Sequence, residues 1–242
     1  MFVYYIRKIF YVFGVSLCIA FFSYQCAYFN TFYNAEKSFE KAVKIIQNTP
    51  LLEEDKLPAE SVTLLNEVIN NCDIVIRDYS DSRYVNKAYF LKGVSYFYKK
   101  TYDLSIENFQ TLLNNGSSVY HDKAILWIAY SFLRLEDINQ SKYYLDQIVF
   151  EDLDNEDLYV YYNMKAELSE SIGDMESAYE NYMLASDVTN NDFRKIYIYR
   201  KLIYLSELSG DLLSKTKFIK LLEPYIENLT ELRNLKIEWI DG

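Results

Sequence analysis

The chain has 242 residues and a formal net charge of −10, with half of its residues hydrophobic and a quarter charged. This composition excludes a largely disordered chain, and the acid excess argues against nucleic acid as a partner, because phosphate binding needs clustered Lys and Arg. Only 6 Gly and 3 Pro are present, so the frequent turn signals of a β-sandwich are missing and long helices joined by short turns are favoured.

The segment 1–25 has the features of a signal peptide. Arg7 and Lys8 precede an uncharged apolar run from Ile9 to Phe22, and a short polar stretch then leads to Cys26. This order matches a secretory signal, and Cys26 lies where a bacterial lipoprotein carries its diacylated thiol. An uncleaved membrane anchor stays open as an alternative, since no charge occurs from Ile9 to Phe29, and so does plain secretion. All three place the rest of the chain outside the cytoplasm.

Two helices are expected before the clear repeats. Hydrophobic spacing predicts a first helix over 31–47, followed by an acidic loop between Pro50 and Pro58, so 26–58 forms an N-terminal helix and loop. A second helix is expected over 59–79. Cys72 shares one face of it with aliphatic residues and is predicted to be a small core residue rather than a reactive thiol.

A helix–turn–helix pattern then recurs at constant spacing. The residue that follows the turn is mostly small, and its steps are 36, 37 and 37 residues: Ser105, Ser141, Ala178 and Lys215. Large residues hold the same register four positions later, at Phe109, Leu145, Tyr182 and Ile219. A second small position precedes the turn, at Gly93, Ala129 and Ala166, with Ile203 in the last unit. Spacings of three and four residues define one stripe of an α-helix.

This register predicts an all-α solenoid of helical hairpins over 59–223, closed by a C-terminal capping helix over 224–242. An irregular helical bundle is the alternative. Bundles do not normally repeat their turn at a constant interval, whereas each unit of a solenoid must, because it buries its apolar face only on its neighbours.

Residues for catalysis or metal binding are scarce. His121 is the only histidine, which excludes a multi-histidine metal site within one chain, and no two glycines lie close enough to form a phosphate-binding loop. The acidic run from Glu151 to Asp157 imitates a calcium loop for a few residues, but it lacks the turn glycine and is better explained as a solvated loop with a helix N-cap. No enzymatic activity, metal or cofactor is expected.

The first helix of each hairpin is expected to line a concave face, and the register selects its outward side chains. They are Lys87, Phe90, Val94 and Phe97; Lys123, Leu126, Tyr130 and Leu133; Asn163, Glu167 and Glu170; and Tyr197, Arg200, Tyr204 and Glu207. The first two units would form a mainly apolar, aromatic wall and the third an acidic one. We expect a peptide or helix of a partner protein to bind there, because large exposed apolar areas are uncommon without a partner. The alternative is that the N-terminal helix or a tight superhelical turn covers these side chains and makes them core.

The repeat resembles the tetratricopeptide repeat, in which small and aromatic residues at fixed positions of one helix pack against those of the other. Tyr89, Gly93 and Tyr96 on the first helix, and Ser105, Phe109 and Leu112 on the second, carry the resemblance best. It implies a right-handed superhelix of helical hairpins that binds other proteins.

The arrangement along the chain resembles the BamD-type outer-membrane lipoproteins. Cys26 precedes the first helix, and the second helix ends in a run in which Tyr79, Ser82 and Tyr84 match a run between repeats of that family. The resemblance implies a lipid-anchored scaffold on the periplasmic face of the outer membrane, with other envelope proteins as partners, among them a β-barrel assembly subunit. A repeat lipoprotein of another envelope machine, for secretion, pilus assembly or cell-wall coordination, is the alternative function.

Overall fold

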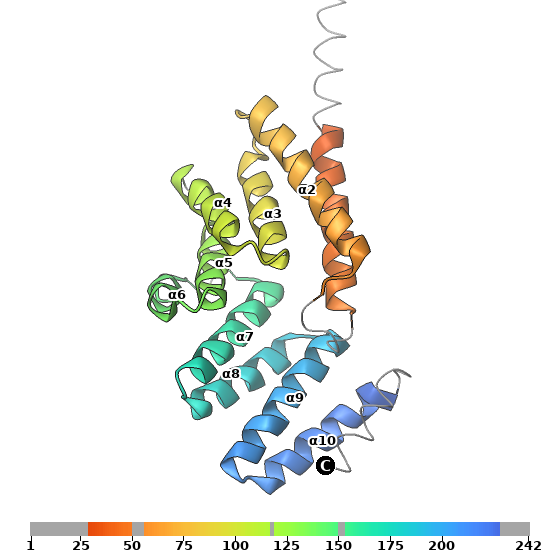
Figure 1. Ribbon diagram of the computed structural model, residues 1–242, viewed down its shortest axis with the longest axis vertical. Helices are drawn as coiled ribbons and strands as arrows, with labels where there is room; N and C mark the ends of the chain where they lie inside the picture. The colour runs from red at the N-terminus through yellow and green to blue at the C-terminus, as the bar shows by residue number, and fades with distance from the viewer. Residues whose placement is uncertain (1–28, 50–55, 117–118, 150–152, 228–242) are drawn as a thin grey trace, which may run out of the picture.

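The computed structural model describes residues 29–49, 56–116, 119–149 and 153–227, and these contain helices and turns but no strand (Figure 1). The helices in chain order are the N-terminal helix (29–47), α2 (Ala59–Asp78), α3 (Val85–Tyr98), α4 (Tyr102–Asn114), α5 (His121–Arg134), α6 (Ile138–Leu145), α7 (Asn155–Ser171), α8 (Met175–Val188), α9 (Asp192–Ser209) and α10 (Leu212–Glu227).

Consecutive helices pair into hairpins, and the hairpins stack one after another from the N-terminal pair to α9 and α10 (Figure 1). Within the described residues the apolar interior is divided into three successive clusters. The first joins the N-terminal helix to α2 and α3, the second spans α3 to α7, and the third spans α7 to α10. A bundle would have one central core, so the predicted all-α hairpin solenoid is confirmed.

The positions that hold the sequence register lie at the contacts between paired helices. Ser105, Ser141 and Ala178 are completely buried, as are Phe109 and Tyr182. The last unit differs, since Lys215 is half-buried and forms an ion pair with Glu207 at 3.3 Å. A cation is tolerated there because its ammonium group reaches the end of α9.

Every repeat turn passes through a residue in the left-handed conformation. These residues have φ between 60° and 80° and keep the repeat spacing: Lys100, Glu136, Gly173 and Gly210. An aspartate follows three of them and accepts a backbone N–H of the next helix as its N-cap: Asp137, Asp174 and Asp211. The turn therefore combines a left-handed helix end with a capped helix start, which closes the hairpin in very few residues.

Glu136→Gly is expected to stabilise the protein by about 1 kcal/mol, because glycine adopts positive φ without the steric cost that a side chain imposes. Glu136 is exposed, so little packing is lost. Urea denaturation of both proteins measures the change. Gly173→Ala is the matched control and should destabilise by about as much, since a Cβ there meets nothing within 4 Å and only the backbone is strained. A loss of stability in Glu136→Gly would contradict this account.

Some expected boundaries differ from the structure. The N-terminal helix is already present at residue 29, the first described residue, where 31 was expected, and α2 ends at Asp78. The expected start of a capping helix after Pro224 is wrong, because α10 continues through Pro224 to Glu227. Proline removes a single backbone donor, and one missing bond in the last turn does not end a helix that packs on α9. Residues 228–242 lie outside the described part of the chain.

The signal-peptide segment and Cys26 also lie outside the described residues. No helix within the described ranges is long and apolar enough to span a bilayer. Cys72 is fully buried in the first core cluster, as expected, and burial raises the pKa of its thiol to about 12. In the acidic run, Asp154 caps α7 by accepting the N–H groups of Glu156 and Asp157, as an N-cap should.

Candidate functional site

A cavity of about 870 Å³ lies on the side of the stack formed by the first helices of the hairpins. Its size falls in the range of protein pockets that bind ligands or peptide segments. α3, α5, α7 and α9 form most of its wall, and the end of the N-terminal helix closes one side through Ile46, Gln47 and Thr49. Asn48, beside these residues, accepts a hydrogen bond from Asn191 at 3.4 Å, which brings the first hairpin to the start of α9.

One wall of the cavity is aromatic. The rings of Trp127 and Tyr130 each lie 4.8 Å, centroid to centroid, from the ring of Phe97, and Tyr102 lies 5.4 Å from it. Phe97 on α3 and Trp127 and Tyr130 on α5 are each less than a tenth exposed. This cluster holds two neighbouring hairpins together and presents a rigid apolar surface.

The neighbouring part of the wall is built around the carboxylate of Glu167 on α7. One of its oxygens accepts hydrogen bonds from Asn163 at 2.9 Å, Tyr197 at 3.1 Å and Tyr130 at 3.2 Å, and the other lies 2.9 Å from a guanidinium nitrogen of Arg134. These donors come from α5, α7 and α9. Glu167 therefore joins three consecutive hairpins through one largely buried charge.

Glu170, one turn further along α7, is neutralised in the same way. It accepts a hydrogen bond from Tyr182 at 2.9 Å and pairs with Lys201 at 2.9 Å. The third unit was expected to present an acidic wall. That expectation is wrong, because both carboxylates are paired with cations from neighbouring hairpins.

The phenol groups around the cavity are held neutral. Burial raises the pKa of Tyr98 to about 12. Burial raises the pKa values of Tyr130, Tyr159 and Tyr197 further, and the negative charge of Glu167 adds to the shift of these three. A phenolate beside a carboxylate in a desolvated site is strongly disfavoured. These hydroxyls therefore act as hydrogen-bond donors over the whole physiological pH range.

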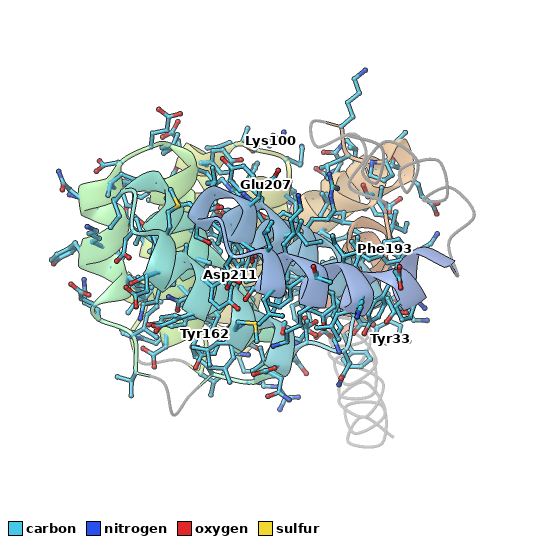
Figure 2. All side chains as sticks on the ribbon, turned by 90° about the horizontal axis from the view of Figure 1, so that it is seen from below. Tyr33, Lys100, Tyr162, Phe193, Glu207 and Asp211 are labelled. Carbon is cyan, nitrogen blue, oxygen red and sulfur yellow. The ribbon has the colours of Figure 1, made fainter. Side chains whose placement is uncertain are left out.

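Several cavity groups remain available to a ligand. The hydroxyls of Tyr98 and Tyr159 make no hydrogen bond to any described residue, and the buried side-chain oxygen of Asn163 likewise has no partner there. Arg194 is not among them, since its guanidinium lies 4.0 Å from the centroid of the Tyr159 ring and pairs with Glu156 at 2.7 Å. Phe193, on the wall formed by α9, is half-buried (labelled in Figure 2). The cavity thus offers both apolar surface and unused polar groups.

Seven of the residues expected on the concave face line this cavity: Phe97, Tyr130, Leu133, Asn163, Glu167, Glu170 and Tyr197. Val94 and Leu126 do not, since they are 2% and 0% exposed and belong to the second core cluster. Their placement on an outward face is therefore wrong.

The remaining expected residues lie outside the cavity. Phe90 packs against Phe109 and Tyr120, and Lys87 is paired with Glu36 of the N-terminal helix. Lys123 pairs with two aspartates, Arg200 is half-buried, and Tyr204 and Glu207 are exposed. The expected set was chosen at equivalent positions in every unit. The cavity instead crosses the helices obliquely, from the C-terminal halves of α3 and α5 to the N-terminal half of α9, so equivalent positions do not all line it.

The sequence reasoning missed the residues that approach the cavity from neighbouring units. They are Arg134, Tyr159, Phe193, Arg194 and Lys201, together with the end of the N-terminal helix. The charges in the sequence could have indicated two of these residues. Arg134 and Lys201 are cations one unit away from Glu167 and Glu170, with which they pair in the structure.

No group of three or more His, Cys, Asp or Glu residues is placed to hold a metal ion within the described residues. His121 lies at the start of α5, with its Nδ1 atom 3.2 Å from the carboxylate of Asp122. Neither His121 nor Asp122 lines the cavity.

Comparison with known proteins bears on the fold. No protein-family model and no curated protein sequence matches the chain. Among solved structures, the chain is similar to one described as "MamA RS-1 ArsTM double mutant", with 11% identity, 81% of this chain and 97% of that chain covered, and a TM-score of 0.51. A second, "MamA 41-end from Desulfovibrio magneticus RS-1", has 13% identity, the same coverages and a TM-score of 0.48. The chain is therefore a tetratricopeptide-like helical solenoid.

Proposed function

We propose that the protein is a scaffold of the cell envelope that binds a segment of a partner protein in the cavity formed by its first helices. The observation that supports this is the cavity itself: about 870 Å³, lined by aromatic rings from four hairpins and by the hydroxyls of Tyr98 and Tyr159, which make no hydrogen bond to any described residue. Rigid aromatic rings with polar tips are the side chains that dominate protein recognition.

The proposal extends to location and partner. The leader and Cys26 support attachment by an N-terminal lipid at the periplasmic face of the outer membrane. The BamD-like order of Cys26, a helix followed by the run from Tyr79 to Tyr84, and stacked hairpins supports a role in β-barrel protein assembly, with a subunit of that machinery as partner. We propose no catalytic role, cofactor or nucleic-acid partner.

Truncating the cavity wall tests the binding site. Phe193→Ala should weaken partner binding at least about tenfold, because a half-buried aromatic anchor in a binding pocket is worth more than about 1.4 kcal/mol. Tyr143→Ala is the matched control, since Tyr143 is 61% exposed on α6 and lies outside the cavity. Affinity purification of both variants and the wild type from native membranes, followed by quantitative mass spectrometry, measures the effect.

The identity of the captured proteins tests the assignment. Recovery of a β-barrel assembly subunit, lost in Phe193→Ala and kept in Tyr143→Ala, would support it. Capture of a secretion, pilus or cell-wall component with the same dependence on Phe193 would favour the alternative envelope machine. Equal capture by both variants would show that the cavity is not the binding site.

A further inference from the structure

The N-terminal helix carries two aromatic rings on its exposed face. Phe29 is 57% exposed and Tyr33 is 42% exposed, and their rings are stacked with centroids 6.1 Å apart and planes inclined by 14°. The opposite face of the same turns packs into the first core cluster through Phe32 and Ala35, which are 2% and 0% exposed. The exposed pair therefore contributes nothing to the interior of the solenoid.

A cation completes this surface one turn further on. The Nζ atom of Lys37 lies 4.9 Å from the centroid of the Tyr33 ring. Phe29, Tyr33 and Lys37 follow each other at intervals of four residues, so they form one straight stripe on the helix, which we call the aromatic–lysine stripe. Its order along the helix is two rings and then a positive charge.

The sequence before the stripe indicates what it faces. No charged residue occurs from Ile9 to Ala35, and the most apolar part of this run ends at Phe22. Only three residue steps separate Cys26 from Phe29, which allow a separation of about 10 Å at most. Whether a lipid on Cys26 or the apolar run itself holds the chain, Phe29 then lies close to the membrane surface.

We infer that the aromatic–lysine stripe is a membrane-interface contact, in which Phe29 and Tyr33 enter the headgroup region and Lys37 binds lipid phosphate. This inference rests on the membrane attachment included in the proposed function. Aromatic rings concentrate at this level of a bilayer, and lysine extends its ammonium group toward the phosphates. The helical rise from Phe29 to Tyr33 is about 6 Å, and the Lys37 ammonium group reaches back over the Tyr33 ring. This separation is close to the depth of the headgroup region, roughly 5 to 7 Å in each leaflet.

The contact would fix how the scaffold stands on the membrane. The N-terminal helix is joined to the next helices by polar contacts, with Ser38 donating to Glu67 on α2 and Lys87 on α3 pairing with Glu36. Its far end forms one side of the cavity through Ile46 and Thr49. A helix held at its start by the membrane therefore sets the height and orientation of the cavity above the lipid surface.

Fluorescence quenching by brominated lipids tests the inference. Full-length protein carrying Phe29→Trp is reconstituted into vesicles of phosphatidylcholine with phosphatidylglycerol, with or without bromine on the acyl chains. The wild-type emission is subtracted from that of Phe29→Trp, which leaves the emission of the introduced tryptophan. This emission should be about twofold lower with brominated than with unbrominated lipid, because we expect the ring to lie at the membrane interface. Tyr143→Trp is the control, on the exposed surface of α6 far from the N-terminal helix, and its emission should not change (Figure 1).

Two further measurements separate the possible outcomes. Lys37→Glu in the Phe29→Trp background should reduce the quenching, since an anionic surface attracts lysine and repels glutamate. Flotation of the same vesicles reports attachment independently. Protein that floats while Phe29→Trp is quenched no more than Tyr143→Trp would overturn the interface contact and leave the anchoring intact. Protein that fails to float would overturn both. If Phe29→Trp melts below the wild type, Tyr33→Trp replaces it with the same expectations.

Discussion

Glu167→Leu is expected to destabilise the protein by about 3 kcal/mol, because it leaves the donors from three hairpins without their common acceptor. Arg134 would lose its carboxylate partner, and the hydroxyls of Tyr130 and Tyr197 would lose theirs. The range for breaking a buried pair extends higher, but 41% of the Arg134 side chain is exposed and water will partly replace the lost charge. Urea denaturation followed by circular dichroism measures the loss.

Two variants make this expectation specific. Glu167→Gln keeps the size of the side chain and one acceptor oxygen, so its loss should be about half as large. Tyr197→Phe removes a single donor, and combined with Glu167→Leu it should cost less than the sum of the separate losses, because both remove the same hydrogen bond. Losses below about 1 kcal/mol in both Glu167 variants would show that the network contributes little to joining the hairpins.

Gly93→Ala is expected to destabilise by about 1.5 kcal/mol, although alanine is the better helix former. A Cβ on Gly93 would lie 2.7 Å from the Cε1 and Cζ atoms of the Phe109 ring, well inside van der Waals contact. Phe109 is fully buried, so its ring cannot turn away without disturbing the second core cluster. Thermal unfolding of the single variant measures the cost.

The matched experiment repeats the substitution in a Phe109→Leu background. A smaller side chain removes the clash, so Gly93→Ala should there be neutral or stabilising by up to about 1 kcal/mol through helix propensity. This coupling is expected because the second unit already has the combination Ala129 with Leu145 at the same positions. An equal cost in both backgrounds would show that the ring is not what excludes a side chain at Gly93.

The fold could be predicted from the sequence because the repeat imposes the same local requirement several times. Ser105, Ser141 and Ala178 must be small where two helices meet, and each is completely buried. A pattern tied to such close contacts is readable without coordinates. Pro224 shows the limit of local signals, since its neighbours on α9 keep α10 helical beyond it.

The candidate site was only partly predictable. Phe97 and Tyr130, both expected on the partner-binding face, line the cavity, because they lie late in their helices, where the cavity crosses α3 and α5. Val94 and Leu126 occupy neighbouring positions on those helices and are buried. The rotation between successive hairpins decides which positions line the cavity, and a rotation of this kind arises from all the contacts between two units rather than from either sequence segment.

The division of the interior into three clusters has a consequence for how the chain acquires its structure. Each cluster is made by helices that are close in sequence, so loop-closure entropy is low and each hairpin can form beside its predecessor as the chain emerges. The cooperative unit is then smaller than the molecule, and an end hairpin can open without exposing the other clusters. Loss of order at one end need not spread to the whole stack.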